Sequence, residues 1–140
     1  MIAHEVSEVT SYDSASFSPP SPIAVVELSV VLFGQKLSVN AVMQVDTGAD
    51  ECCIPKSTIR QLANQLGYGT LPSDFRTVID FNGRPSRHRY FTLDLRLQQQ
   101  TTVISAGFVE VSEDIGLIGR NVLNHFNICL DGPNGIMTVI

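Results

Sequence analysis

The sequence has no apolar run that approaches the ~20 residues needed to cross a membrane. Its first residues, Met1-Ile2-Ala3-His4-Glu5, have neither the basic start nor the apolar centre of a signal peptide. We therefore expect a soluble, cytoplasmic protein with no membrane partner.

Cysteine and histidine are scarce, with three residues of each. Three cysteines, two of them adjacent at Cys52 and Cys53, do not make a disulfide framework and favour a reducing compartment. Their spacing and that of the histidines match no Cys-x-x-Cys or His-x-x-x-His pattern, so we expect no metal. A Gly-x-Ser-x-Gly elbow for a nucleophilic serine is missing as well. No cofactor is expected.

Basic residues are too few for a nucleic-acid-binding protein. The chain has nine Lys and Arg against fourteen Asp and Glu, a net charge of −5 and a pI near 5.0. Because it shows neither basic runs nor interleaved aromatic residues, we expect no nucleic-acid partner. Its 140 residues are enough for one domain with a real core.

The chain divides by composition into a tail and a domain. Residues 1–21 are mostly polar and rich in serine, which predicts a flexible N-terminal tail. A cleavable pro-segment and a strand of a dimer interface are the alternatives. From residue 22 onward β-branched residues dominate, and residues 22–140 are expected to form the folded domain.

An acidic tight turn at Asp46 is the centre of the sequence. The segment Asp46-Thr47-Gly48-Ala49-Asp50 directly follows an apolar run over residues 37–44. A carboxylate at the end of a strand, a neighbouring hydroxyl and a glycine that admits backbone N–H groups are what an aspartic peptidase half-site needs. Alone, the tripeptide is more typical of a surface Asp/Gly turn.

A second segment, Ile115-Gly116-Leu117-Ile118-Gly119-Arg120-Asn121-Val122-Leu123, adds to that motif. With both segments in this order, the sequence resembles the retropepsin-like aspartic peptidases over roughly residues 22–140. The resemblance implies an all-β, retropepsin-like acid-protease barrel with one or two short helices, completed as a homodimer. It also implies that the chain ends interleave in the sheet of the dimer.

The chemistry needs two aspartates, but Asp46 lies in the only Asp-Thr-Gly or Asp-Ser-Gly of the chain. A second copy must therefore supply the other, and the resemblance implies a C2 homodimer with both turns on the axis. Two carboxylates that share a proton can activate a water and protonate the leaving nitrogen. The expected catalytic residues are Asp46, Thr47 and Gly48. By resemblance, Thr47 bonds to the backbone of its symmetry mate.

The remaining residues of the two motifs are expected to bind substrate or support the site. By resemblance, Asp50 pairs with Arg120 and meets the substrate backbone beside Ala49, and an Arg–carboxylate clamp is physically reasonable. The alternative is two unconnected surface charges. Gly119 and Asn121 are expected to support the site, with Asn121 bonding locally near the start of its helix.

An Asn82-Gly83 pair between two extended segments, residues 76–81 and 84–97, predicts a β-hairpin. By resemblance this hairpin is the flap that covers a bound peptide. We place its tip at residues 81–85 and expect Phe81, Asn82 and Gly83 to bind substrate. The tip is not glycine-rich as in the viral members, and an ordinary exposed hairpin is the alternative.

Other segments predict structural elements. Residues 55–67 are expected to form a helix that starts at Pro55, packs its apolar face on the core and ends at Gly67. Residues 101–111 are expected to form a strand pair, residues 119–126 a short helix, and residues 127–130 and 136–140 two strands.

Together these features predict a homodimeric aspartic endopeptidase that hydrolyses extended peptide or protein substrates. The alternative is a dimeric binding module that keeps the fold without turnover. A third hypothesis is an unrelated β-barrel binding domain, which a monomeric state in solution would favour.

Overall fold

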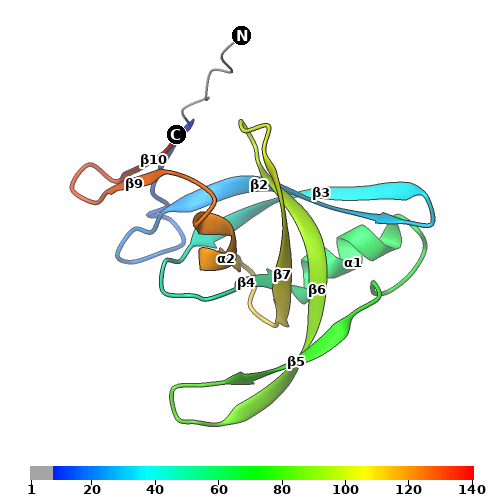
Figure 1. The fold of residues 1–140 in the computed structure, drawn as a ribbon. Helices are drawn as coiled ribbons and strands as arrows, with labels where there is room; N and C mark the ends of the chain where they lie inside the picture. Colours follow the sequence, from blue (N-terminus) through cyan, green and yellow to red (C-terminus); the bar gives the residue numbers. More distant parts are fainter. Residues whose placement is uncertain (1–7) are drawn as a thin grey trace.

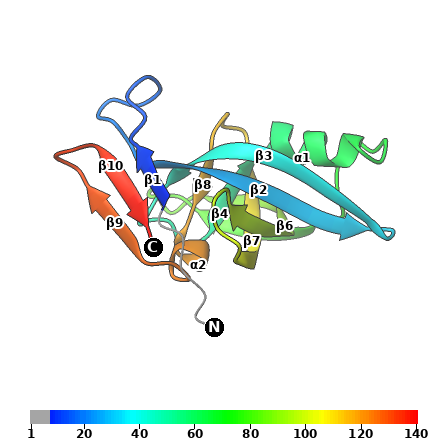
Figure 2. The same ribbon diagram turned by 90° about the horizontal axis from the view of Figure 1, so that it is seen from above.

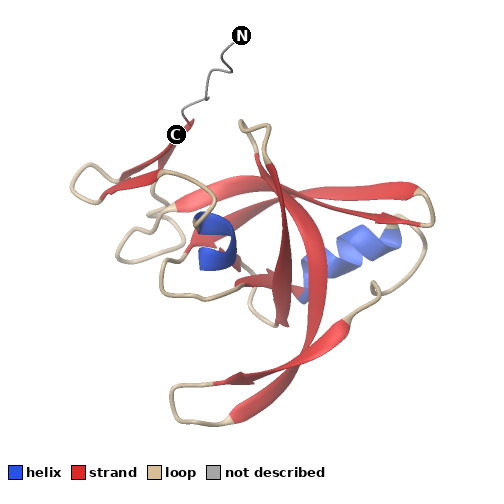
Figure 3. Cartoon of the chain, viewed as in Figure 1, coloured by secondary structure: helices blue, strands red, loops and turns tan. Residues whose placement is uncertain are grey.

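The chain is built mainly from β-strands. A computed structural model describes residues 8–140, and strands dominate it (Figures 1 and 3). The predicted all-β class with two short helices is therefore confirmed. The elements in chain order are β1 (Glu8–Ser11), β2 (Ile23–Leu32), β3 (Gln35–Val45), β4 (Cys52–Pro55), α1 (Lys56–Asn64), β5 (Asp74–Ile79), β6 (Pro85–Leu97), β7 (Val103–Val111), β8 (Gly116–Ile118), α2 (Arg120–Leu123), β9 (Ile128–Asp131) and β10 (Ile136–Val139).

Six strands form a closed barrel in the order β2-β3-β8-β4-β7-β6. The barrel closes where Val26–Ser29 of β2 pair with Leu97–Asp94 of β6. Most neighbours are antiparallel, but β3 with β8 and β4 with β7 are parallel. Strand β5 lies outside the barrel and, among the strands of residues 8–140, pairs only with β6.

The interior follows from the period-2 alternation of the strands. On β6, Phe91, Leu93, Leu95 and Leu97 are buried while the residues between them face outward. Strand β7 opposes them, with Phe108 fully buried. Each such side chain stabilises the fold by about 1.5–3 kcal/mol relative to leaving it in water.

Helix α1 forms where predicted. Pro55 occupies its N-cap, and Ile59, Leu62 and Ala63 are buried on one face against the barrel. The helix ends at Asn64 with Gln65 as its C-cap, three residues before the predicted end at Gly67. Gly67 lies in the turn that follows, with a φ of 77°, and the Tyr68 amide donates to the Ala63 carbonyl at 3.1 Å. Neither helix in the described part of the chain is long and apolar enough to span a membrane.

The region of residues 101–111 differs from its prediction. Instead of a strand pair it forms the single strand β7, which pairs continuously with β6 from Val103 opposite Arg96 to Val109 opposite Tyr90. A turn at Gln98–Gln100 joins the two strands, with the Gln100 amide bonded to the Leu97 carbonyl at 2.9 Å. The long partner strand holds the whole segment extended.

The two ends of the chain form a separate sheet in the order β1-β10-β9 (Figure 2). Glu8–Ser11, which composition placed in a flexible tail, pairs with Ile136–Val139. Residues 1–7 of the predicted tail lie outside the described residues. Both edges of β10 are thus occupied by strands of the same chain. The domain boundary at residue 22 stays a prediction, and so does the interleaving of chain ends in a dimer.

Candidate active site

Strand β3 delivers Asp46 to the surface of the barrel. Val45 pairs with Ile118 of β8, and the Asp46 amide donates to the Ile118 carbonyl at 3.0 Å. The Asp46 side chain is half-buried, and its Oδ1 accepts the Gly48 N–H at 2.9 Å. A Cβ at Gly48 would lie 3.3 Å from the same oxygen. Glycine therefore lets the backbone approach the carboxylate closely.

The two predicted motifs meet in space through their main chains. The Arg120 amide donates to the Ala49 carbonyl at 2.8 Å, and the Asn121 amide donates to the Asp50 carbonyl at 3.2 Å. These bonds connect the Asp46 turn to the start of α2. The loop that carries the carboxylate is therefore fixed by a segment about seventy residues later in the sequence.

The ion pair between Asp50 and Arg120 is present. The Arg120 guanidinium also donates from Nη1 to the Thr47 carbonyl at 2.8 Å, so one side chain spans both ends of the turn. Because the Asp50 side chain is 84% exposed, the pair adds little to stability. Its effect is to hold the turn in one geometry.

Gly119 and Asn121 contact the main chain that directly follows the Asp46 loop. A Cβ at Gly119 would lie 2.5 Å from the Glu51 carbonyl carbon and 2.6 Å from its oxygen, so no other residue fits. The Asn121 side chain reaches further than the local bond we expected. Its Oδ1 accepts the Cys52 N–H at 3.1 Å and its Nδ2 donates to the Gly107 carbonyl at 3.0 Å. From the second position of α2, the Asn121 amide points toward β4 and β7 rather than along its own helix.

Cys52 takes part in the same set of hydrogen bonds, although we predicted no role for it in the site. Its buried thiol lies 3.3 Å from Asn121 Oδ1 and accepts the Gly119 N–H at 3.4 Å. Burial raises the pKa of Cys52 to about 12, so this thiol stays protonated. It is a structural group rather than a nucleophile.

The predicted hairpin is formed by β5 and β6, which extend below the barrel in Figure 1. Asp80 fixes its turn by accepting the Asn82 and Arg84 amides at 2.9 and 2.8 Å, and Gly83 takes a φ of 75°. The side chain of Phe81 is fully exposed. Within residues 8–140, no hydrogen bond joins this tip to the Asp46 turn.

A groove of about 490 Å³ lies between the Asp50 side of the loop and the base of the hairpin. Of the residues predicted for the site, only Asp50 lines this groove; Asp46 and the hairpin-tip residues 81–83 do not. Polar and apolar side chains share its wall, and several of them were not predicted. The lining residues are Asp50, Glu51, Cys53, Arg76, Thr77, Val78, Ile79, His88, Val109 and Val111.

Glu51, Arg76 and Tyr90 form a contact cluster that sequence reasoning missed. Glu51 pairs with Arg76 of β5, and the Tyr90 hydroxyl of β6 donates to Glu51 Oε1 at 3.3 Å. The Arg76 guanidinium lies 3.9 Å from the centroid of the Tyr90 ring. The feature of the sequence that could have indicated this cluster is the position of Glu51, directly after the Asp46-Thr47-Gly48-Ala49-Asp50 motif.

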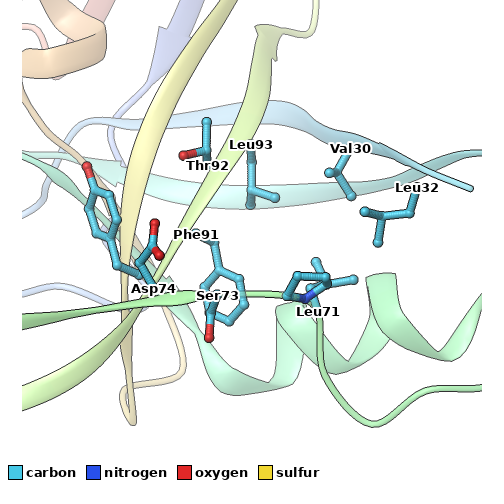
Figure 4. Close-up of a pocket in the computed structure, with 10 residues that line it drawn as sticks. Val30, Leu32, Leu71, Ser73, Asp74, Phe91, Thr92 and Leu93 are labelled. Carbon is cyan, nitrogen blue, oxygen red and sulfur yellow. The ribbon is translucent and has the colours of Figure 1, made fainter.

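A second cavity, of about 310 Å³, lies beside the segment that leads from α1 to β5 (Figure 4). Val30, Leu32, Leu71 and Phe91 contribute apolar walls, and Asp74 lies at its rim. None of the residues predicted for the site lines it. The geometry therefore favours the groove beside Asp50.

No family model matches the sequence, and no curated protein matches it. Among solved structures it is similar to the crystal structure of a retropepsin-like aspartic protease from Rickettsia conorii. The two superpose with a TM-score of 0.58 at 14% sequence identity, over 97% of this chain and 91% of that chain. At this identity the similarity shows the fold alone. The predicted retropepsin-like fold is thereby confirmed.

Proposed function

We propose that the protein is an aspartic endopeptidase that acts as a homodimer on extended polypeptides. The observation that carries this proposal is the Asp46 carboxylate, fixed by the Gly48 N–H at the end of a barrel strand in a retropepsin-like fold. A chance Asp/Gly turn would not need a later glycine and arginine packed against it. Here Gly119 and Arg120 are in direct contact with that loop.

A dimer follows from the number of carboxylates. Each chain offers one Asp46, and the two-aspartate chemistry needs a second within about 3 Å. In a C2 pair the same turn from each chain meets on the axis. Thr47 is exposed on the turn, so its hydroxyl is free to cross that axis and hold the two turns in register.

In the dimer the two Asp46 carboxylates cannot both ionise, so they share one proton. The ionised carboxylate takes a proton from a bound water, whose oxygen attacks the peptide carbonyl carbon. The protonated partner stabilises the gem-diol, and a proton then passes to the leaving nitrogen as the C–N bond breaks. No residue forms a covalent bond to the substrate.

The β5–β6 hairpin is suited to cover an extended peptide. Strand β5 pairs with β6 alone, which leaves its other edge open to strand addition. Phe81 and Ile79 are exposed near the tip and can contact apolar substrate side chains. Asn82 and Gly83 form the turn, where closure would exclude water from the reacting amide.

The test is cleavage of an unfolded protein between pH 4 and 7.5 by wild type, Asp46→Asn and the control Asp114→Asn. Asp114 is an exposed carboxylate outside the groove beside Asp50, so its variant makes the same charge change elsewhere. Sizing of all three proteins measures dimerisation. We expect loss of at least about 1000-fold in kcat for Asp46→Asn alone, because one proton-sharing partner is removed.

Two results would overturn the proposal. Dimers that cut nothing at any pH would indicate a binding module that keeps the fold without turnover. An optimum above about pH 8 would contradict a dyad that shares one proton.

A further inference from the structure

We propose that Glu51 is a positioning residue that holds both strands of the β5–β6 hairpin to the active-site loop. The inference rests on the proposed peptidase function, which it deepens by naming what sets the position of the hairpin over the groove. It is carried by the cluster of Glu51, Arg76 and Tyr90, which we call the hairpin anchor.

The hairpin needs side-chain contacts to the rest of the chain because its backbone hydrogen-bond ladder has only two strands. Tyr90 is the branch point: it pairs with Val109 of β7 on one side and with Asp74 of β5 on the other. From Tyr90 toward the tip the backbone ladder has only two strands, and most residues of β5 are exposed. An isolated two-stranded hairpin is marginally stable in water.

Glu51 contacts each strand through a different side chain. Arg76 lies on β5, two residues beyond the branch point, and makes the ion pair with Glu51. Tyr90 lies on β6 and donates its hydroxyl to the same Glu51 oxygen. The stacking of Arg76 on the Tyr90 ring ties the two strands to each other.

The barrel wall is shaped to receive the Tyr90 ring. A Cβ at Gly107 of β7 would lie 1.6 Å from the Tyr90 hydroxyl, so the ring occupies the space that this glycine leaves. The Gly107 carbonyl in turn accepts the Asn121 side-chain N–H. A continuous set of contacts therefore runs from the second motif through β7 to the hairpin anchor.

This arrangement predicts an effect on substrate binding rather than on the chemical step. Without the Glu51 charge the hairpin would sample more open positions, and a peptide would have to order it on binding. The Glu51 and Arg76 side chains are 28% and 42% exposed, which limits their coupling. We expect Glu51→Gln to raise KM about threefold to fivefold with kcat within about twofold.

Amide hydrogen exchange of residues 75–89 tests the anchor without cleavage. We expect Glu51→Gln and Arg76→Gln each to accelerate exchange on both strands several-fold, and the double variant to accelerate it by less than the two single effects combined. Arg87→Gln is the matched control, because Arg87 stacks on Phe75 at 4.2 Å in the same hairpin without contacting Glu51. Exchange over β2 and β3 should not change in any variant.

The anchor is overturned if Glu51→Gln leaves exchange of residues 75–89 unchanged, if Arg87→Gln accelerates it equally, or if the effects of the two single variants simply add. It is also overturned if Glu51→Gln lowers kcat and leaves KM unaltered. A failure of the peptidase proposal is recognised separately, since cleavage would then be absent in wild type while the exchange results would still stand.

Discussion

The Asp46 loop and the β5–β6 hairpin are held in place in opposite ways. Main-chain bonds from β8 and α2 fix the loop, and it rests on the buried Gly119 and Cys52. The hairpin is an exposed two-stranded ladder, and side chains rather than main-chain bonds connect it to the rest of the chain: the hairpin anchor at its base, and the His88 ring, which is hydrogen-bonded to the Glu110 carbonyl of β7 at 2.9 Å. The comparison teaches that Asp46 lies on a loop held by main-chain bonds, and that the hairpin, which depends on exposed side-chain contacts, is expected to open more easily.

Gly119→Ala is expected to disrupt the loop most. The new Cβ would meet the Glu51 main chain at 2.5 Å, and backbone there cannot move cheaply, so we expect a loss of about 3 kcal/mol or more in the free energy of unfolding. Urea unfolding measures it. Gly132→Ala is the control, because a Cβ at Gly132 meets no atom within 4 Å. Equal losses in the two variants would show that Gly119 has no special packing role.

Asn121→Ala tests the bonds beneath the loop. It leaves the Cys52 N–H and the Gly107 carbonyl without their partner, which should cost about 2 kcal/mol. The exposed Asn124, at the C-cap of the same helix, provides the control variant Asn124→Ala, with a change within about 0.5 kcal/mol. If Asn121→Ala unfolds at the same urea concentration as wild type, the loop does not depend on these bonds.

The loop was largely predictable from sequence for a physical reason. A tight acidic turn restricts residue types locally, and Gly119 is required because the Glu51 main chain would lie 2.5 Å from a Cβ at that position. The hairpin was predictable as an element from its Asn82-Gly83 turn. The two motifs and the Asn82-Gly83 turn therefore predicted the loop and the hairpin as elements, but of the predicted site residues only Asp50 lines the groove.

The anchor and the terminal sheet were not predictable in the same way. Glu51 meets Arg76 and Tyr90, which are 25 and 39 residues away, only because of the register of β5, β6 and β7. Strand β1 lies in a polar segment and is extended because β10 pairs with it. Such contacts depend on tertiary context, which local propensity does not contain.

The buried Cys52 thiol makes the stability of the loop depend on pH. Burial raises its pKa from 9.0 to about 12 in the folded state, so the stability it contributes is complete below pH 9 and falls as the pH rises toward 12. We expect wild type to lose about 1 kcal/mol more than Cys52→Ser between pH 8 and 10.

Urea unfolding of both proteins at the two pH values measures this difference. Cys53 also has a raised pKa, caused mainly by burial, but it is common to both proteins and cancels. Parallel pH profiles would mean that the Cys52 thiol is not held protonated by the loop.

Asp80→Ala should have the smallest and most local effect. It removes the carboxylate that accepts the Asn82 and Arg84 amides at the hairpin tip, a loss of about 0.5–1 kcal/mol in local stability. Exchange should accelerate at the tip while the urea midpoint stays unchanged, because opening the tip does not unfold the barrel.

Asp131→Ala is the matched control, since Asp131 accepts the Asn134 amide in the β9–β10 turn, and its effect should be confined to those strands. A shifted urea midpoint for Asp80→Ala would mean that the hairpin and the barrel unfold as one unit. The loop and the hairpin would then not differ in local stability.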